Sequence, residues 1–252
     1  MNREIYRQKW SRFQQRQEKI YTRKFKKALQ EQVSQYLSQG AITAEPLQNV
    51  LIDLYKTVGP LWSAKTGIRK GGIVEMKAGG MGFSERILEL LRDYFFIDLF
   101  NDAQLMTQYS REVIARVLTQ ASITGASTSD IVKELTAHPD FSAMRARRIA
   151  RTETVTASNV AAVINAKESG LKMNKEWISV QDKRTRHSHR SIDGRIVGIN
   201  DYFTMDTGVT MQQPGARQQQ DGQAVPGSEV VNCRCVCGFI PVRGRNGLPV
   251  RV

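Results

Sequence analysis

The stretch Trp177-Ile-Ser-Val-Gln-Asp182-Lys-Arg-Thr-Arg186-His-Ser-His189-Arg-Ser-Ile-Asp193-Gly194 and the later run Asn232-Cys233-Arg-Cys235-Val-Cys237 decide the fold of the C-terminal half. Both stretches combine polar side chains that could bind ligands with apolar residues that alternate along the chain, as they also do over 195–199. Alternation with a period of two is typical of β-strands. The sequence therefore predicts a small module with strands in which two distant polar segments meet.

Before Gly170 the apolar spacing is helical. Residues 3–38 place aromatic and aliphatic side chains three and four positions apart, which predicts a long helix that ends near Gly40. Further helices are predicted from about 44 to 58 with a stop at Gly59-Pro60, over two segments between 84 and 123, from 127 to 135, and from 142 to 169. The predicted fold class is α+β, a helical N-terminal body followed by a small mixed α/β-rich C-terminal module. We place the boundaries at 1–64 (basic helical region), 65–82 (glycine-rich hinge), 83–141 (helical body) and 142–252 (C-terminal module).

The charge of the chain is strongly positive and unevenly distributed. The formal net charge is +13, and residues 1–30 hold ten Lys/Arg against two Asp/Glu. Such a balance favours an anionic partner, and double-stranded DNA bound through phosphate contacts is one candidate. The alternative is a solvated helix face whose aromatic side docks on another subunit. The aromatic stripe indicates one buried face, so we favour a protein partner on that stripe over DNA alone. The candidate DNA-binding residues are Arg16, Lys19, Arg23, Lys24, Lys26 and Lys27.

Several classes of protein are disfavoured by composition and motifs. No stretch approaches the roughly 20 apolar residues that a membrane span needs. The three cysteines all lie within 233–237, which does not resemble the disulfide framework of a secreted protein, so we expect a reducing cytosol. Residues 59–66 come close to a phosphate-binding loop, but Ala64 stands where the second glycine is required, and we reject nucleotide binding there.

The histidines and cysteines of the C-terminal module raise the question of a metal site. In a strand, Cys233, Cys235 and Cys237 would all point to one face. Together with histidine, thiolates suit tetrahedral zinc, and His187, His189, Cys233 and Cys235 could supply four ligands. The alternative is that the cysteines are small packing residues.

Two further readings of the polar residues concern catalysis and structure. His189, Asp182 and Asn232 could form a metal-dependent nuclease site, although carboxylates are scarce. The helical segment 145–159 carries Arg151 and Glu153 on its polar side. Its arginines could pin one part of the chain to another through bidentate pairs with a carboxylate, for which Asp182 or Asp193 are the expected partners.

Four motifs occur in an order that resembles the phage Mu protein F-like minor head proteins, over about residues 130–242. They are Arg-Ala-x-Arg-Ile-Ala-Arg-Thr-Glu (145–153), Trp-x-x-x-x-Asp (177–182), Arg-x-x-His-x-x-Ile-Asp-Gly (186–194) and Asn-Cys-Arg-Cys (232–235). Relatives carry Cys-x-x-Cys and His-Pro at positions where this chain has Arg186, His189 and Val230. The resemblance therefore leaves His189, Cys233 and Cys235 as zinc ligands, which His187 or Cys237 would have to complete.

The resemblance implies a minor capsid protein that acts in head morphogenesis of a tailed phage. It implies association with the portal protein, with other capsid proteins and with packaged DNA, inside the virion and in the host cytoplasm during assembly. Some relatives carry an appended toxin domain, for which we expect no room here. The alternatives are a metal-dependent nuclease and a free nucleic-acid-binding protein. A structural rather than a catalytic role is expected for Arg151, Glu153, Trp177, Asp182, Arg186, Asp193, Gly194 and Asn232.

Overall fold

The computed structural model describes residues 2–69, 72–73 and 85–252, so most of the predicted glycine-rich hinge at 65–82 lies outside the described residues. The helices are α1 (Arg3–Gln39), α2 (Glu45–Lys65), α3 (Glu85–Thr124), α4 (Thr128–Ala137), the 3-10 turn η1 (Pro139–Phe141), α5 (Ala143–Lys167), α6 (His187–Ser191) and α7 (Gly227–Val230). The strands are β1 (Ile68–Arg69), β2 (Gly72–Ile73), β3 (Met173–Ile178), β4 (Ile196–Gly198), β5 (Phe203–Thr204), β6 (Thr210–Met211) and β7 (Val236–Pro241). This order confirms the predicted α+β class.

The long helix α1 has defined ends. The Asn2 side chain accepts the backbone N–H groups of Glu4 and Ile5, and Gly40 ends the helix in the left-handed conformation with φ 70°. The aromatic stripe of this helix lies inside the molecule, where the Trp10 ring meets Trp62 of α2 at 4.8 Å. The prediction that this stripe docks a protein partner is therefore wrong, because the chain itself covers most of it. The buried apolar members are Tyr6, Trp10, Phe13, Tyr21, Phe25, Ala28, Leu29 and Val33.

Helix α2 does not stop at Gly59-Pro60, as the sequence predicted, but continues through Pro60 to Lys65. Gly59 instead allows α2 to approach α5 closely. A Cβ atom at residue 59 would lie 3.0 Å from the Cβ of Ala161 and 3.1 Å from the carbonyl oxygen of Ala157. The glycine is thus a packing residue, and the segment that resembles a phosphate-binding loop lies largely within a helix.

Gly59→Val is expected to lower the free energy of unfolding by about 1–3 kcal/mol, because the added methyl groups collide with the α5 backbone. Lys56→Val is the matched control, since Lys56 is exposed on the same helix and only helix propensity is lost there, at most about 0.7 kcal/mol. Chemical denaturation followed by circular dichroism measures both. Equal losses in the two variants would contradict the close contact.

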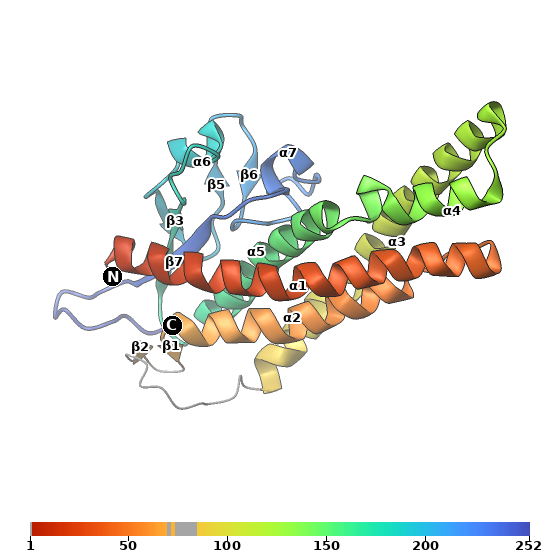
Figure 1. Cartoon of the computed structure of the whole chain (residues 1–252). Coiled ribbons are helices and arrows are strands. Elements are labelled where there is room, and N and C mark those ends of the chain that lie inside the picture. Colours follow the sequence, from red (N-terminus) through yellow and green to blue (C-terminus); the bar gives the residue numbers. More distant parts are fainter. Residues whose placement is uncertain (1, 70–71, 74–84) are drawn as a thin grey trace.

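The helical body extends away from the sheet. Residues 85–124 form one continuous helix, α3, where the sequence predicted two. Helix α4 begins with a capping box in which Ser127 and Asp130 exchange hydrogen bonds, and it folds back along α3 at the far end of the molecule (Figure 1). Helix α5 packs along both α1 and α2. None of the helices, as far as the structure describes them, is long and apolar enough to cross a membrane.

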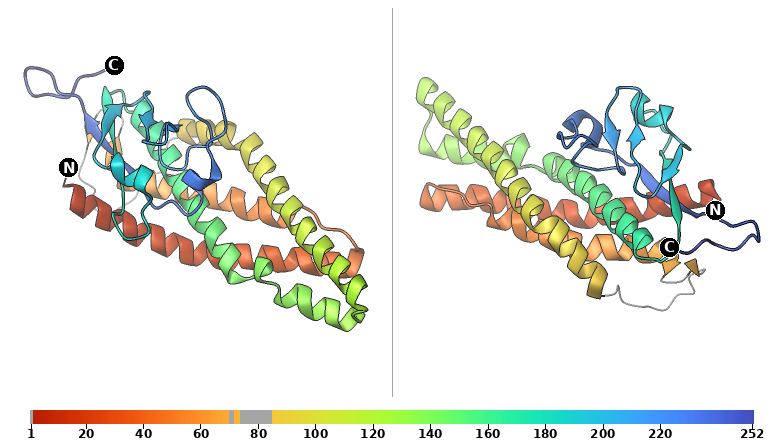
Figure 2. Two further views of the ribbon diagram at one scale, coloured as in Figure 1. Left: turned by 90° about the horizontal axis from the view of Figure 1, so that it is seen from above. Right: turned by 180° about the vertical axis from the view of Figure 1, so that it is seen from behind.

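The C-terminal module is built on a three-stranded antiparallel sheet with the order β4-β3-β7. Its strands match the three alternating runs of the sequence, and Trp177 of β3 pairs with Cys237 of β7. The buried Asn159 of α5 fixes β7 to the helices: its side chain donates to the Cys235 carbonyl at 3.3 Å and accepts the Cys237 N–H at 2.8 Å. The sheet lies beside the N-terminal part of α1, and both chain ends are on this side of the molecule (Figure 2).

One hydrophobic core runs from the helices into the sheet. Helix α5, assigned from the sequence to the C-terminal module, is shared by both parts. The segment 205–230, predicted as a polar loop, contains β6 and the short helix α7. The fold thereby brings Ser188, His189 and Glu229 into contact with one another and with the Cys233–Cys235 turn.

Candidate metal centre and its polar surroundings

Three of the four predicted metal ligands come together in the structure. The Nδ1 atom of His189 and the Sγ atoms of Cys233 and Cys235 all lie within 4.8 Å of one another, and the three residues are buried. His189 Nδ1 is 3.4 Å from Cys235 Sγ and 3.6 Å from Cys233 Sγ. One imidazole nitrogen and two thiols are donors that zinc prefers, so the residues present fit the metal that the sequence suggested.

The imidazole of His189 is held from both sides. The Trp177 ring packs edge-on against it with ring centroids 5.2 Å apart. On the far side of the ring, Nε2 lies 3.1 Å from Glu229 Oε2, and the same carboxylate oxygen accepts the Ser188 hydroxyl at 2.8 Å. A carboxylate near the outer nitrogen is usual behind a metal-binding histidine, although here the Glu229 contact is an ion-pair distance and Nε2 makes no hydrogen bond to the described residues.

The cluster perturbs the pKa values of its members. Burial lowers the His189 pKa, but the hydrogen bond and charge of Cys233, helped by Glu229, outweigh burial and raise it above its usual value. The hydrogen bond from Cys235 and the contact with His189 hold the pKa of the Cys233 thiol well below its usual range. Burial raises the pKa of the Cys235 thiol. These shifts favour a thiolate–imidazolium pair between Cys233 and His189, so a metal ion bound here would displace a proton from the imidazole.

His187 and Cys237 do not join this cluster. The His187 side chain is 88% exposed and its Nδ1 lies 2.6 Å from Asp206 Oδ2. Cys233 and Cys235 precede β7, whereas Cys237 lies within it, so the prediction of three cysteines on one strand face is wrong. Cys237 is buried, and burial raises its thiol pKa to about 12. The proposed fourth ligand His187 is therefore not supported by the geometry.

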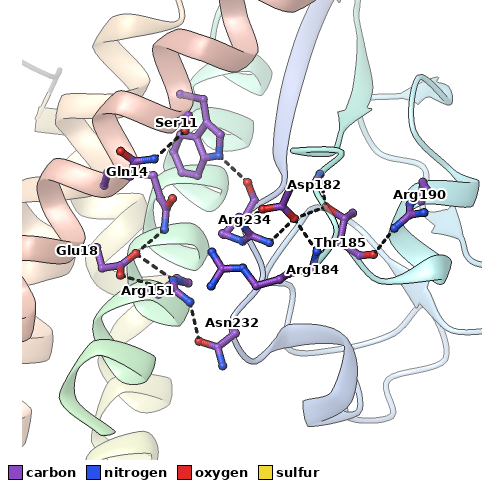
Figure 3. A network of polar contacts seen from close by, with 12 residues as sticks. Ser11, Gln14, Glu18, Arg151, Asp182, Arg184, Thr185, Arg190, Asn232 and Arg234 are labelled. Atoms are coloured by element: carbon purple, nitrogen blue, oxygen red, sulfur yellow. Dashed lines mark hydrogen bonds and ion pairs between the residues drawn. The ribbon is translucent and has the colours of Figure 1, made fainter. Parts of the chain in front are cut away.

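Arg151 anchors the Asn-Cys-Arg-Cys turn to the helices (Figure 3). Its guanidinium binds Glu18 of α1 through two contacts, at 2.9 and 2.7 Å, and also donates to the Asn232 side chain at 3.3 Å. Asn232 has a positive φ of 62°, and its backbone N–H donates to the Thr152 hydroxyl at 3.0 Å. The prediction of Asp182 or Asp193 as the partner of this polar stripe is wrong, because Glu18 takes that place.

The two aspartates instead bind arginines of other segments. Asp182 forms a two-contact pair with Arg234, and this guanidinium and its hydrogen bonds hold the Asp182 pKa well below its usual range. Asp193 accepts from Arg3 at 2.9 Å and from the Ser179 N–H at 2.7 Å. These contacts connect the module to itself and to α1.

The remaining structural residues of the motif are also placed. Gly194 has a φ of 82°, and a Cβ there would lie 3.3 Å from the Arg3 guanidinium, so glycine is favoured for both reasons. Arg186 donates to the Val231 carbonyl and thereby spans the two polar segments. Glu153 is buried, where it accepts the Tyr55 hydroxyl at 2.6 Å and pairs with Arg217 at 3.0 Å. The structure thus gives each of these residues a contact within the chain.

All the candidate DNA-binding residues of α1 have exposed side chains: Arg16, Lys19, Arg23, Lys24, Lys26 and Lys27. Lys24 forms an ion pair with Asp53 of α2, with Nζ 2.6 Å from Oδ2. Sequence reasoning did not single out Glu18, Arg3, Arg217 or Glu229, because single charged residues carry no spacing signal that reveals a distant partner.

A family model described as phage Mu protein F like protein matches residues 112–238, which is half of the chain and runs from within α3 to within β7. The chain belongs to the phage Mu protein F-like family. This confirms the resemblance drawn from the four motifs. The match includes α5, the candidate ligands and Glu229, but not α1 or α2.

Three curated proteins are similar to this Mu F-like chain. An NAD(+)–arginine ADP-ribosyltransferase, EFV, of Enterococcus faecalis is 33% identical over 50% of this chain and 26% of its own length. The uncharacterized protein YqbB of Bacillus subtilis is 31% identical over 53% of this chain and 43% of its own length. The minor head protein GP7 of Bacillus phage SPP1 is 26% identical over 50% of this chain and 40% of its own length. The chain thus spans less than half the length of these relatives. No solved structure matches it.

Proposed function

We propose that this chain is a minor head protein of a tailed bacteriophage, built into the virion and acting in head morphogenesis. The observation that carries the proposal is membership of the Mu F-like family together with the similarity to a phage minor head protein. The assignment is tested by deleting the gene in the phage that encodes it. Deletion is expected to abolish most infectious particles, with recovery when the chain is supplied in trans. Normal yields of infectious particles without it would contradict the proposal.

The role we propose is structural rather than enzymatic. The similarity to an ADP-ribosyltransferase covers a quarter of that protein. A nuclease site of His189, Asp182 and Asn232 is disfavoured, because Asp182 is bound by Arg234 and Asn232 by Arg151. Their polar groups are thus occupied by contacts within the chain, which counts against the nuclease.

We further propose that the protein associates with the portal and with packaged double-stranded DNA. Because the aromatic stripe of α1 is buried, the portal contact must use another surface. DNA is assigned to the opposite, exposed face of α1. Arg16, Lys19 and Arg23 follow one another at intervals of three and four residues, so they share one face. From Arg16 to Lys27 this basic face extends about 17 Å along the helix, long enough to meet several phosphates.

The DNA contact is tested by the salt dependence of binding to duplex DNA. Replacing Arg16, Lys19, Arg23 and Lys27 by glutamine is expected to reduce the slope of log affinity against log salt by up to about 3–4. The control variant has the same charge change at exposed positions elsewhere: Lys133, Lys172, Lys183 and Arg245. Equal losses in both variants would show that net charge, and not the α1 face, governs binding.

A further inference from the structure

The cluster of His189, Cys233 and Cys235 has three ligand side chains, whereas zinc in proteins is almost always bound by four groups. Among the described residues, no further His, Cys, Asp or Glu side chain joins the group. Glu229 cannot complete it, because it lies at Nε2, on the other side of the imidazole from the Nδ1 atom that faces the two sulfurs. The protein therefore supplies one ligand fewer than a closed structural site requires.

A small pocket borders all three ligands. Its other walls include Arg184, Arg186 and Asn232, of which Arg184 and Asn232 are exposed and Arg186 is half-buried. The pocket thus leads from the buried ligands towards solvent. Its volume of about 10 Å³ has room for roughly one ligand atom of the size of a water oxygen beside the cluster.

The charges around the pocket indicate what that ligand is. A zinc ion with two thiolates and a neutral imidazole carries no net charge. Arg234, which also lines the pocket, is neutralised by Asp182, whereas Arg184 and Arg186 add positive charge at the pocket wall. A small anion is therefore favoured over a neutral or cationic ligand.

We propose that His189, Cys233 and Cys235 bind one zinc ion through three protein ligands, and that the fourth position takes a small anion from solvent through this pocket. The site is thereby open, in contrast to a structural site with four protein ligands. This inference does not depend on the assignment to a phage head.

Arg186 offers a direct way to test the open position. It lines the same pocket and precedes His189 by three residues, a spacing at which a cysteine and a second ligand commonly share a zinc ion. Arg186→Cys is expected to close the site with a fourth protein ligand. The variant removes an arginine whose guanidinium contacts a backbone carbonyl, and it leaves the buried ligands in place.

The experiment uses the full chain, loaded with zinc for metal analysis and with cobalt(II) for absorption spectroscopy. The wild type is expected to hold one metal per chain, and azide, the probe anion, is expected to shift its cobalt d–d bands. Arg186→Cys is expected to bind zinc at least tenfold more tightly in competition with a chromophoric chelator. Azide is expected to leave the cobalt d–d bands of this variant unchanged. Absence of metal, or wild-type bands that azide leaves unchanged, would overturn the proposal.

Ligand identity is tested with two matched pairs of variants. Cys235→Ala is expected to lose the metal, whereas Cys237→Ala, an equally buried cysteine outside the cluster, is expected to keep it. His189→Ala is expected to lose it and His187→Ala to keep it. Circular dichroism confirms that each variant is folded. Retention of metal by folded Cys235→Ala would contradict the assignment.

Discussion

Trp10→Ala is expected to lower the free energy of unfolding by about 3–5 kcal/mol, as truncation of a large buried aromatic side chain commonly does. The Trp10 side chain is fully buried, its ring packs on Phe13 and Trp62, and its Nε1 donates to the Arg234 carbonyl at 2.7 Å. It thereby joins α1 to the turn that carries Cys233 and Cys235. Urea denaturation followed by tryptophan fluorescence and circular dichroism measures the loss.

Two variants separate the contributions of Trp10. Trp10→Phe keeps most of the buried ring but removes the Nε1 donor, so it is expected to cost less than the alanine variant. Ile5→Ala is the surface control on the same helix, because Ile5 is 64% exposed, and its effect is expected within about 0.5 kcal/mol. A Trp10→Ala loss no larger than that of the control would show that α1 does not stabilise the module.

Glu153→Ala is expected to lower the free energy of unfolding by about 1–3 kcal/mol, because it removes the carboxylate that accepts the buried Tyr55 hydroxyl, whereas Arg217 keeps its ion pair with Asp102. Glu153 of α5 receives the Tyr55 hydroxyl of α2 and pairs with Arg217 of the loop after β6. Burial and the Glu153 charge raise the Tyr55 pKa well above its usual value, so the phenol stays protonated and donates. Thermal and urea unfolding measure the loss.

The control for Glu153→Ala is Glu168→Ala, because Glu168 is an exposed glutamate just beyond the end of α5. Its effect on stability is expected within about 0.5 kcal/mol. If Glu153→Ala kept full stability but lost function in phage assembly, the residue would have a chemical role instead of the structural one assigned to it.

Local patterns were sufficient to predict the secondary structure in many places. The three strands of the central sheet follow the alternating runs, and α1 ends at Gly40 as its spacing predicted. Patterns failed where tertiary packing decides. Gly59-Pro60 reads as a helix stop, yet the contact with Ala157 and Ala161 of α5 accounts for the glycine within a continuous helix.

Long-range pairing explains the other errors. An aromatic stripe on a helix requires a covering surface, but the sequence does not say whether that surface belongs to the same chain, and here α2 and α5 provide it. Likewise, Arg151 requires a carboxylate, and several were available; the fold selects Glu18, which is far away in the sequence.

The candidate metal site was partly accessible from the sequence. Residue types alone indicated His189, Cys233 and Cys235, because histidine and cysteine near one another are typical zinc ligands. His187 and His189 are the same residue type, so the sequence could not distinguish them. Both lie on the short helix α6, which buries His189 and exposes His187. Glu229 was missed because it stands alone in a polar segment.

Head composition tests the central claim most directly. Quantitative mass spectrometry of purified phage heads, with isotope-labelled peptides of this chain and of the portal protein, gives the number of copies per portal ring. The account predicts a few copies in every head, still present after the DNA has been emptied. Absence of the chain from heads, despite strong expression in infected cells, would contradict it.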